Sequence, residues 1–373
     1  MKIAVALFTY FPHGGMQRDC LAIAQGLATR GHAITIFTRS WRGKRPDGIA
    51  VEALPVRALT NHGRNGAFAR AANKAIIAGG FDYVLGFDRM PGLDAYFMAD
   101  RCHAERLAGR GALHRLTPRA RAMLATERAV FGDDTRPEIL VLVEREREAV
   151  RRRYATPAKR FHAIPPILGA EFQRPADAET QRAAMRRALG IDVGALALLF
   201  VATRFHTKGL DRALGALAAL PKDLRERSRL LVVGGDDPGR YGRLPGGRQA
   251  RFLGARDDLP ALMLAGDLLL HPAREELAGK VLVEALAMGL PVLCAGIAGY
   301  APHVTSAEAG RVLPEPFAQA ALDRALAEML PALPTAPWAA NAVAYARREP
   351  GFGDGIAVAV DTVDRLARES ARR

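Results

Sequence analysis

Short, continuous apolar runs recur along the whole chain and alternate with segments of helical periodicity. In the first half, the runs are KIAVALFTYF (2–11), AITIFT (33–38), VEALPV (51–56), YVLGF (83–87) and EILVLV (138–143). Apolar residues that follow one another without polar interruption are typical of strands covered on both faces. Together with amphipathic helices such as GGMQRDCLAIAQGLATRGH (14–32), these strands predict a parallel, doubly wound α/β sheet.

The same order of elements restarts after FHAIPPILG (161–169). We expect strands at 195–203, 229–235, 249–255, 268–273 and 291–296, with helices at 208–220, 259–266 and 280–289. We therefore predict two Rossmann-like domains, residues 1–166 and 167–350, and a C-terminal helix within 351–373. Ligands of such sheets bind beyond the carboxyl ends of the strands, so two sheets facing each other would form a central cleft with two half-sites.

The charge of the chain is strongly positive, with 53 Lys and Arg against 39 Asp and Glu, a net +14. This excess indicates a nucleic acid, a membrane surface or a phosphorylated substrate as partner, unless it reflects only an Arg-rich composition. Nucleic acid is the weaker choice: the basic residues are spread over both predicted domains, and aromatic residues make up only 6%. We expect no nucleic-acid partner.

The location of the protein is predicted from three absences in the sequence. No apolar run reaches the ~18 residues of a membrane span. The first run is short and ends in a Gly turn, unlike a signal peptide. The three cysteines have no metal or redox spacing and suit a reducing compartment. We therefore expect a cytoplasmic protein.

The segment REELAGKVLVEAL (274–286) places Glu276 in a strand-to-helix loop and Glu284 more than a turn into a helix that starts at about Gly279. A helix N-terminus has free N–H groups and a partial positive charge, so it is suited to a diphosphate. Carboxylates on either side of it accept hydrogen bonds from vicinal hydroxyls. The pattern fits a nucleotide sugar, although a solvated loop acid and a surface helix acid would look the same.

Two further strand-to-helix loops carry candidate ligand contacts. In VATRFHTKGLDRA (201–213), Arg204 and Lys208 could neutralise a diphosphate, or could be solvated loop cations. In FPHGGMQRD (11–19), Gly14 and Gly15 would let the backbone approach a phosphate or a sugar, and Asp19 follows one helical turn later. The pattern is not GxGxxG, and no acidic residue ends the second strand, so a nicotinamide cofactor is not expected.

Polar residues also gather at two other places in the first half. TNHGRN (60–65) is predicted to form a turn whose Asn61, His62 and Arg64 could hold a sugar or a phosphate. After the strand at 83–87, the stretch GFDRMPGLDAYFMADRCHAER (86–106) includes Asp100 and His103. These side chains are candidates for acceptor binding or proton transfer, although each acid could equally be structural.

The segment 101–128 is rich in arginine with interleaved apolar residues, and only Glu105 and Glu127 are acidic. It is interpreted either as an amphipathic basic helix at a bilayer surface or as a solvated, salt-bridged helix face. Its arginines and leucines are Arg101, Arg106, Arg110, Arg115, Arg119, Arg121, Arg128, Leu107, Leu113, Leu116 and Leu124.

These stretches together resemble a known enzyme family. The spacing Glu276-x7-Glu284 resembles the signature of retaining glycosyltransferases of family 4, which have the GT-B fold. YFPHGGMQRD (10–19), TNHGRN (60–65), MPGLD (90–94), PVLCAGIAGYA (291–301) and EPF (315–317) resemble, more narrowly, the glucosyltransferases of the lipopolysaccharide core that act on the first heptose. The resemblance covers nearly the whole chain. It implies that the C-terminal helix crosses back onto the first domain.

The resemblance also implies roles for the donor site, with a UDP-sugar, most simply UDP-glucose, as the donor. Glu276 would contact the sugar hydroxyls, Glu284 the ribose hydroxyls and Lys208 the diphosphate. In this family an arginine often precedes the lysine; Thr207 stands there in this chain, so Arg204 is the candidate to replace it. Backbone groups would complete the site, at Gly14, Gly15, Arg256 (for the uracil), Leu277, Ala278, Gly279, Lys280 and Val281.

The acceptor side and the reaction are likewise implied by the resemblance. Asp19 and Asp100 would face the reaction centre beside Lys208 and Glu276. The acceptor would be a lipid-anchored, phosphorylated heptose at the cytoplasmic face of the inner membrane, to which segment 101–128 would attach the enzyme. The residues that contact the acceptor would be Asn61, His62, Arg64 and His103.

Sugar transfer would retain the anomeric configuration, without metal or other cofactor, and the sequence has no Asp-x-Asp motif to hold one. The resemblance favours a front-face route in which the leaving phosphate helps to deprotonate the acceptor hydroxyl, because no carboxylate nucleophile stands out. The alternative is another retaining GT-B transferase with a different donor or acceptor.

Overall fold

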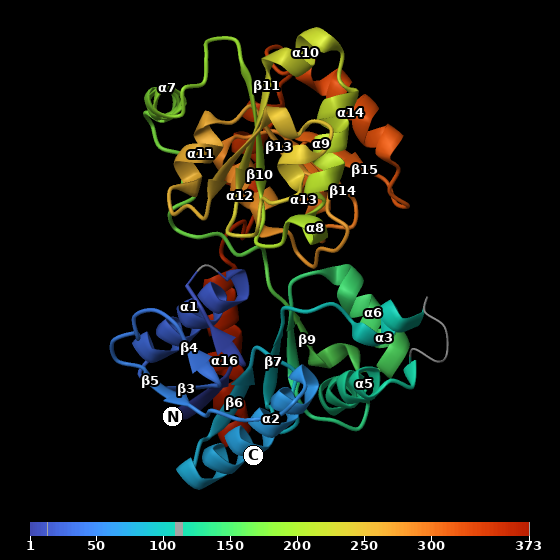
Figure 1. Cartoon of the computed structure of the whole chain (residues 1–373). Helices are drawn as coiled ribbons and strands as arrows, with labels where there is room; N and C mark the ends of the chain where they lie inside the picture. Colours follow the sequence, from blue (N-terminus) through green and yellow to red (C-terminus); the bar gives the residue numbers. More distant parts are fainter. Residues whose placement is uncertain (13, 109–114, 373) are drawn as a thin grey trace. The chain divides into compact units, whose positions relative to one another are not determined.

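The computed structural model describes residues 1–12, 14–108 and 115–372. The chain divides into two compact units, Met1–Ile167 with Gly353–Arg373, and Leu168–Phe352 (Figure 1). Each unit is built on one parallel sheet, so the predicted α/β class with two Rossmann-like sheets is confirmed.

The first unit contains a seven-stranded sheet with the order β5-β3-β1-β6-β7-β8-β9, and all neighbouring strands are parallel. Val5 of β1 lies beside Ile36 of β3 and Leu85 of β6. The strands are β1 Lys2–Ala6, β3 Ala33–Thr38, β5 Ala50–Ala53, β6 Tyr83–Gly86, β7 Ala95–Met98, β8 Glu138–Val141 and β9 Phe161–Ala163, with a small separate pair, β2 Thr9–Tyr10 and β4 Ser40–Trp41. The helices are α1 Gly15–Thr29, α2 Asn61–Gly79, α3 His103–Ala108, α5 Pro118–Phe131, α6 Glu144–Tyr154 and α16 Gly355–Ala371.

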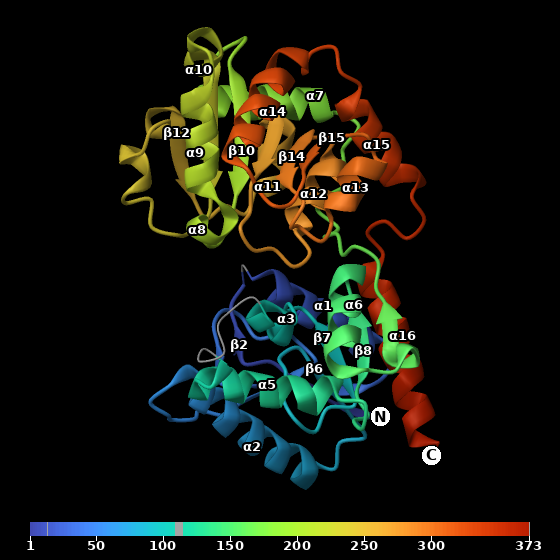
Figure 2. The same cartoon turned by 90° about the vertical axis from the view of Figure 1, so that its right-hand side faces the viewer.

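Both faces of this first sheet are buried, which explains the uninterrupted apolar runs. Successive side chains of a strand point to opposite faces. Ile3 and Val5 pack on one face with residues of α1 and α16, whereas Ala4 and Ala6 pack on the other with Phe68 of α2. α2 and α5 lie together on this second face (Figure 2).

The second unit contains a six-stranded parallel sheet with the order β12-β11-β10-β13-β14-β15. Leu198 and Leu199 of β10 lie beside Leu268 and Leu269 of β13. The strands are β10 Leu196–Val201, β11 Ser228–Val233, β12 Ala250–Gly254, β13 Leu268–His271, β14 Val292–Ala295 and β15 Gly310–Leu313. The helices are α7 Ala178–Ala188, α8 Phe205–Lys208, α9 Leu210–Ala219, α10 Lys222–Arg227, α11 Leu259–Ala265, α12 Lys280–Met288, α13 Ala301–Ser306, α14 Gln319–Ala332 and α15 Trp338–Arg348.

The C-terminal helix α16 packs on α1 of the first unit, as the resemblance implied (Figure 1). Its buried face includes Ala359, Val360 and Val363. Gly26 of α1 makes room for it, since a Cβ at this position would lie 2.6 Å from Val360 Cγ2. At the rim, His32 Nε2 lies 2.8 Å from an Asp364 carboxylate oxygen. The last segment of the chain therefore completes the core of the first unit.

Three predictions about local structure are wrong. TNHGRN is not a turn but the start of α2, because Thr60 caps the helix by accepting a hydrogen bond from the Gly63 amide at 3.1 Å. VEALPV is not covered on both faces, because β5 pairs only with β3 at the sheet edge and is largely exposed. Segment 101–128 is not one helix, because Thr117 and Pro118 begin a new helix, α5.

Substitution of Val363 tests the contribution of α16. Val363→Asp would place an unpaired charge at a fully buried position, which costs about 3 kcal/mol or more, against a total stability of about 5–15 kcal/mol for a domain. We expect a marked loss of unfolding free energy in urea, measured by circular dichroism. The control Ala357→Asp adds the same charge at an exposed position in the first turn of α16 and should stay within about 0.5 kcal/mol of the parent. Equal shifts in the two variants would contradict the packing role of α16.

Candidate active site

The loop between β13 and α12 carries the first acid of the predicted pair. α12 begins at Lys280, next to the predicted start at Gly279, and Glu284 lies inside it and is buried. Gly279 has a φ of +84°, which favours glycine. A Cβ there would also lie 3.2 Å from Glu276 Cγ. The small residue at this position is therefore required for the loop to turn into the helix beside Glu276.

The backbone of this loop is anchored on the side facing the next strand. The carbonyl groups of Leu277 and Ala278 accept hydrogen bonds from the amides of Gly299 and Tyr300 at 2.8 and 2.7 Å. The N-cap residue Gly279 forms no side-chain cap hydrogen bond, and the first turn of α12 contains no acidic residue. The partial positive charge of this helix end suits a phosphate.

Glu276 is the centre of a three-residue cluster. Its Oε2 lies 2.8 Å from Lys208 Nζ and 3.0 Å from His271 Nε2. The side chain is 13% exposed. Burial by itself raises the pKa of the carboxyl group, but the hydrogen bond with His271 and the charge of Lys208 outweigh it and hold the pKa at about 2. Glu276 is therefore a permanent carboxylate at neutral pH.

The position of Lys208 is set by the contact between two loops. Gly209, with a φ of +80°, lies so close to Pro272 that a Cβ would be 2.1 Å from the Pro272 carbonyl oxygen. Arg274 donates two hydrogen bonds to Asp211, at 2.7 and 2.6 Å. Lys208 Nζ also donates to the Glu275 carbonyl at 3.1 Å. The loop after β10 and the loop after β13 thus form one rigid rim, from which Lys208 reaches Glu276.

The other predicted cations of this unit lie outside the cluster. Arg204 precedes α8 and is exposed, and its guanidinium forms no ion pair with any residue that the structure describes. Arg256 follows β12 and forms a two-pronged ion pair with Asp258, at 2.8 and 2.5 Å. Neither side chain contacts Glu276 or Lys208.

In the first unit, the predicted glycines and Asp19 lie at the start of α1. Gly14 precedes α1 and Gly15 begins it, and Asp19 is buried within the helix. Asn61, His62 and Arg64 are separate from them in sequence and occupy the first turn of α2, where the Arg64 guanidinium contacts the Asn61 side-chain oxygen.

Asp100 and His103 follow β7 and differ in environment. Asp100 is exposed, 3.8 Å from the Arg89 guanidinium. His103 begins α3, and burial lowers the pKa of its imidazole although the nearby Glu127 acts in the opposite direction. Glu127 is fully buried and accepts a hydrogen bond from the amide of Ala104 at 2.9 Å, besides its ion pair with Arg89. Arg89 and Glu127 therefore stabilise the start of α3.

Sequence reasoning missed the residues that organise the Glu276 cluster. His271 is the last residue of β13, within LLLHPA (268–273), and its Nε2 lies 3.0 Å from the Glu276 carboxylate. Nε2 must carry the ring proton for this contact, because a carboxylate only accepts hydrogen bonds. Asp236 was also missed; it accepts a hydrogen bond from the Phe205 amide at 2.7 Å, at the start of α8. A polar residue at the end of a buried strand is the signal that could have found His271.

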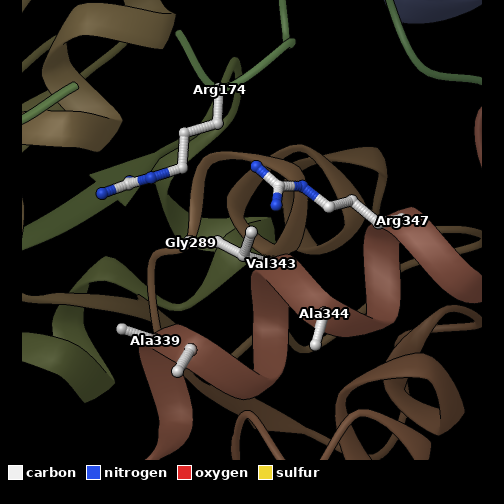
Figure 3. Close-up of a pocket in the computed structure, with 7 residues that line it drawn as sticks. Arg174, Gly289, Ala339, Val343, Ala344 and Arg347 are labelled. Atoms are coloured by element: carbon white, nitrogen blue, oxygen red, sulfur yellow. The ribbon is translucent and has the colours of Figure 1, made fainter. Parts of the chain in front are cut away.

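A hollow of ≈ 360 Å³ in the second unit lies away from this cluster. It is lined by Gly289, just after the C-terminal end of α12, by Val343 of α15 and by Arg174. Arg347 extends from α15 over Val343 (Figure 3). The loop that carries Glu276 precedes the opposite end of α12, so this hollow is not part of the cluster.

Two features are absent from residues 1–12, 14–108 and 115–372. These residues contain no group of three or more His, Cys, Asp and Glu side chains placed to hold a metal ion. They also contain no helix that is both long and apolar enough to cross a bilayer.

The chain is similar to known glycosyltransferase families and structures. Residues 13–168 match the model of Glycosyltransferase Family 4, and residues 181–336 match that of Glycosyl transferases group 1. The HepE protein of Anabaena, solved in complex with UDP-glucose, has the same fold, with a TM-score of 0.71, 19% identity, and coverage of 100% of this chain and 99% of that one.

Stronger similarity is found to one enzyme. The lipopolysaccharide glucosyltransferase WaaG of Escherichia coli (strain K12) is 39% identical over 352 residues, which are 93% of this chain and 94% of that protein. A crystal structure of WaaG, a glycosyltransferase involved in lipopolysaccharide biosynthesis, has a TM-score of 0.92 at 38% identity and covers 97% of this chain and 99% of that one. The chain belongs to the WaaG-type family of retaining glycosyltransferases, within glycosyltransferase family 4 and with the GT-B fold.

Proposed function

We propose that the protein transfers glucose from UDP-glucose to a heptose of the lipopolysaccharide inner core, with retention of configuration. The observation that carries the proposal is the Glu276–Lys208 pair, at 2.8 Å, beside the N-terminus of α12. It joins an acceptor for sugar hydroxyls, a cation for a diphosphate and a helix end that binds phosphate. The name of the WaaG relative supports glucose and lipopolysaccharide as the substrate classes.

Binding of the donor would replace the Glu276–Lys208 contact. In the structure the two side chains neutralise each other. A diphosphate would bind the backbone amides of residues 278–281 and attract Lys208. Glu276 would then lose Lys208 as its partner and accept hydrogen bonds from the sugar hydroxyls. Its contact with His271 would remain. Glu284, farther along α12, would bind the ribose hydroxyls. The backbone near Arg256 would receive the uracil, with Arg204 as a second cation for the diphosphate.

The first unit would provide the rest of the site. Gly14 and Gly15 would bring the backbone of α1 to the diphosphate, with Asp19 and Asp100 facing the reaction centre. The acceptor would bind through the first turn of α2, at Asn61, His62 and Arg64. His103 would add a neutral ring, because burial lowers the pKa of its imidazole.

On the proposed route, the bond between the anomeric carbon and the diphosphate breaks while the acceptor oxygen attacks from the same face. The proton of the acceptor hydroxyl passes to the departing phosphate oxygen. The negative charge that develops there is stabilised by Lys208 and by the α12 amides, which are already oriented before the reaction. Glu276 is held by two partners, which suits it to binding hydroxyls rather than to forming a covalent intermediate. No metal ion takes part in this scheme.

We also propose attachment to an anionic membrane through the segment 101–128. Arg119, Arg121 and Arg128 of α5 are exposed, and Leu116 just before α5 is 68% exposed. Each basic residue near an anionic leaflet contributes about 1 kcal/mol. Other residues of the segment serve the fold instead: Leu107 is buried and Arg101 pairs with Glu146 at 3.1 Å. Arg110 and Leu113 lie outside the described residues.

Substitutions of Glu276 and Glu284 should have different effects on the affinity for UDP. Glu284→Gln removes a charged hydrogen-bond acceptor for ribose, worth about 1.5–3 kcal/mol, so UDP should bind about 10- to 100-fold more weakly. Glu276→Gln frees Lys208 for the diphosphate, so UDP affinity should be kept or increased while turnover falls. Calorimetry with UDP measures the first effect and glucosyl transfer the second. Equal UDP affinity in the two variants would refute the ribose assignment.

Loss of Lys208 should act mainly on turnover. The charge on the leaving diphosphate increases as the bond breaks, so Lys208→Met should lower kcat by about 10²–10³-fold with a smaller change in the KM for UDP-glucose. Lys222→Met, at an exposed position, is the control and should have parental kinetics. Near-normal rates in Lys208→Met together with a large loss in Arg204→Gln would transfer the role to Arg204.

Vesicle binding should depend on the exposed arginines of α5. Replacement of Arg119, Arg121 and Arg128 by Glu should abolish co-sedimentation with anionic vesicles at low salt, and high salt should release the parent protein. The matched control replaces Arg243, Arg248 and Arg324 of the second unit, also exposed, and changes the net charge equally. Binding of the parent to neutral vesicles, or equal loss in both triple variants, would show that α5 is not the attachment surface.

A further inference from the structure

A polar cavity of ≈ 340 Å³ lies in the first unit, at the carboxyl ends of three adjacent strands. Thr9 follows β1, Arg39 follows β3 and Asp88 follows β6. After β1 the chain builds β3 and β5 on one side and then continues with β6 on the other, so β1 and β6 meet where the strand order reverses. Open α/β sheets bind ligands at this topological switch point. The volume falls within the range of roughly 300–1,000 Å³ for ligand pockets.

Arg39 is fixed in the wall of the cavity by three side-chain hydrogen bonds and one aromatic ring. Its Nε donates to the Phe8 carbonyl at 3.2 Å, Nη1 to Asn65 Oδ1 at 2.9 Å, and Nη2 to Thr9 Oγ1 at 3.3 Å. The guanidinium also lies over the Phe8 ring, 5.1 Å from its centroid. Each Nη has a second N–H, which these contacts leave available. The group is therefore pre-oriented to donate to a ligand at little entropic cost.

Asp88 supplies the matching acceptor. The Phe8 amide donates to its Oδ2 at 2.5 Å. No described residue donates a hydrogen bond to Oδ1, and no described cation forms an ion pair with Asp88 within 4.0 Å. Burial raises the pKa of this carboxyl group to about 7, although the Phe8 amide and the charges of Arg39 and Arg89 oppose the increase. Hydrogen bonds donated by the hydroxyl groups of a ligand would stabilise the ionised form of Asp88.

The composition of the cavity distinguishes between two kinds of ligand. It contains one guanidinium and one carboxyl group, together with the side-chain amides of Gln17, Asn61 and Asn65 and the hydroxyl of Thr9. A phosphate mainly accepts hydrogen bonds and would repel the ionised form of Asp88, whereas vicinal hydroxyls can donate to Asp88 and accept from Arg39 at the same time. The balance of donors and acceptors therefore favours a neutral, hydroxylated ring.

We propose that this cavity binds a phosphate-free, hydroxyl-bearing face of the acceptor pyranose, with Arg39 and Asp88 as the residues that hold its hydroxyls. The proposal rests on the proposed function, since it takes the acceptor to be a saccharide, and Asn61 is shared between the two. It assigns any phosphate of the acceptor to contacts outside this cavity.

The test compares acceptor kinetics with donor binding. Asp88→Asn and Arg39→Gln are the variants, and Asp47→Asn and Arg42→Gln, at exposed positions nearby, are the controls. We expect the KM for a soluble heptoside to rise about 10- to 100-fold in each variant, by the same factor with and without a phosphate on the heptoside. The Kd of UDP and the rate of UDP-glucose hydrolysis should not change. Asp88→Asn keeps a side-chain oxygen that can accept the hydrogen bond from the Phe8 amide. If Asp88→Asn or Arg39→Gln lowers the melting temperature, Asn65→Ala is a further variant.

The outcomes are separable. An unchanged acceptor KM in the variants, or a loss confined to phosphorylated heptosides, would overturn the proposal. If the parent enzyme transfers to no heptoside, the proposed function fails, and the cavity is then tested by saturation-transfer NMR with neutral methyl pyranosides. Binding of such a sugar that is lost in Asp88→Asn but kept in Asp47→Asn would support the cavity assignment alone. No binding to the parent, or equal binding to both variants, would overturn it.

Discussion

The contact of Glu276 with Lys208 and His271 is the interaction that joins the loops after β10 and β13 into one candidate site. A largely buried carboxylate is costly unless it is paired and hydrogen-bonded. Here the pairing requires two loops from different strands to meet, which in turn requires Gly209 to lie against Pro272 and Arg274 to bridge to Asp211. The order of β10 next to β13 places these two loops side by side at one edge of the sheet.

The parts of this site that follow from local chemistry could be predicted from the sequence. The small residues before an apolar helical run predicted the start of α12 to within one residue. The polar residues that follow strands were predicted to lie at the carboxyl ends of the sheet. The contact of His271 with Glu276 could not be predicted, because it depends on how the intervening loop returns to its own strand. The start of α2 was missed for a different reason: Thr60 and the glycines beside it suit a turn and a helix cap equally well.

Much of the positive charge stabilises the fold, which is why net charge was a weak guide to partners. Arg160 is buried and donates to the carbonyls of Pro137, Gly132 and Val130. Arg182 and Arg186 both pair with Asp267, whose carboxylate accepts from the backbone at the start of β10. A planar guanidinium suits such sites, since it satisfies several carbonyl groups at once. The net charge of the chain therefore overstates the positive charge that is available to a partner.

The two units present different electrostatics, and the proposed reaction requires the difference. The departing diphosphate gains negative charge, so the second unit provides a cation and a positive helix end, with Glu276 to balance the cation before the donor binds. The acceptor hydroxyl is neutral until its proton passes to that phosphate, so the first unit needs orientation more than charge. A cavity with one guanidinium and one carboxyl group supplies orientation through hydrogen bonds.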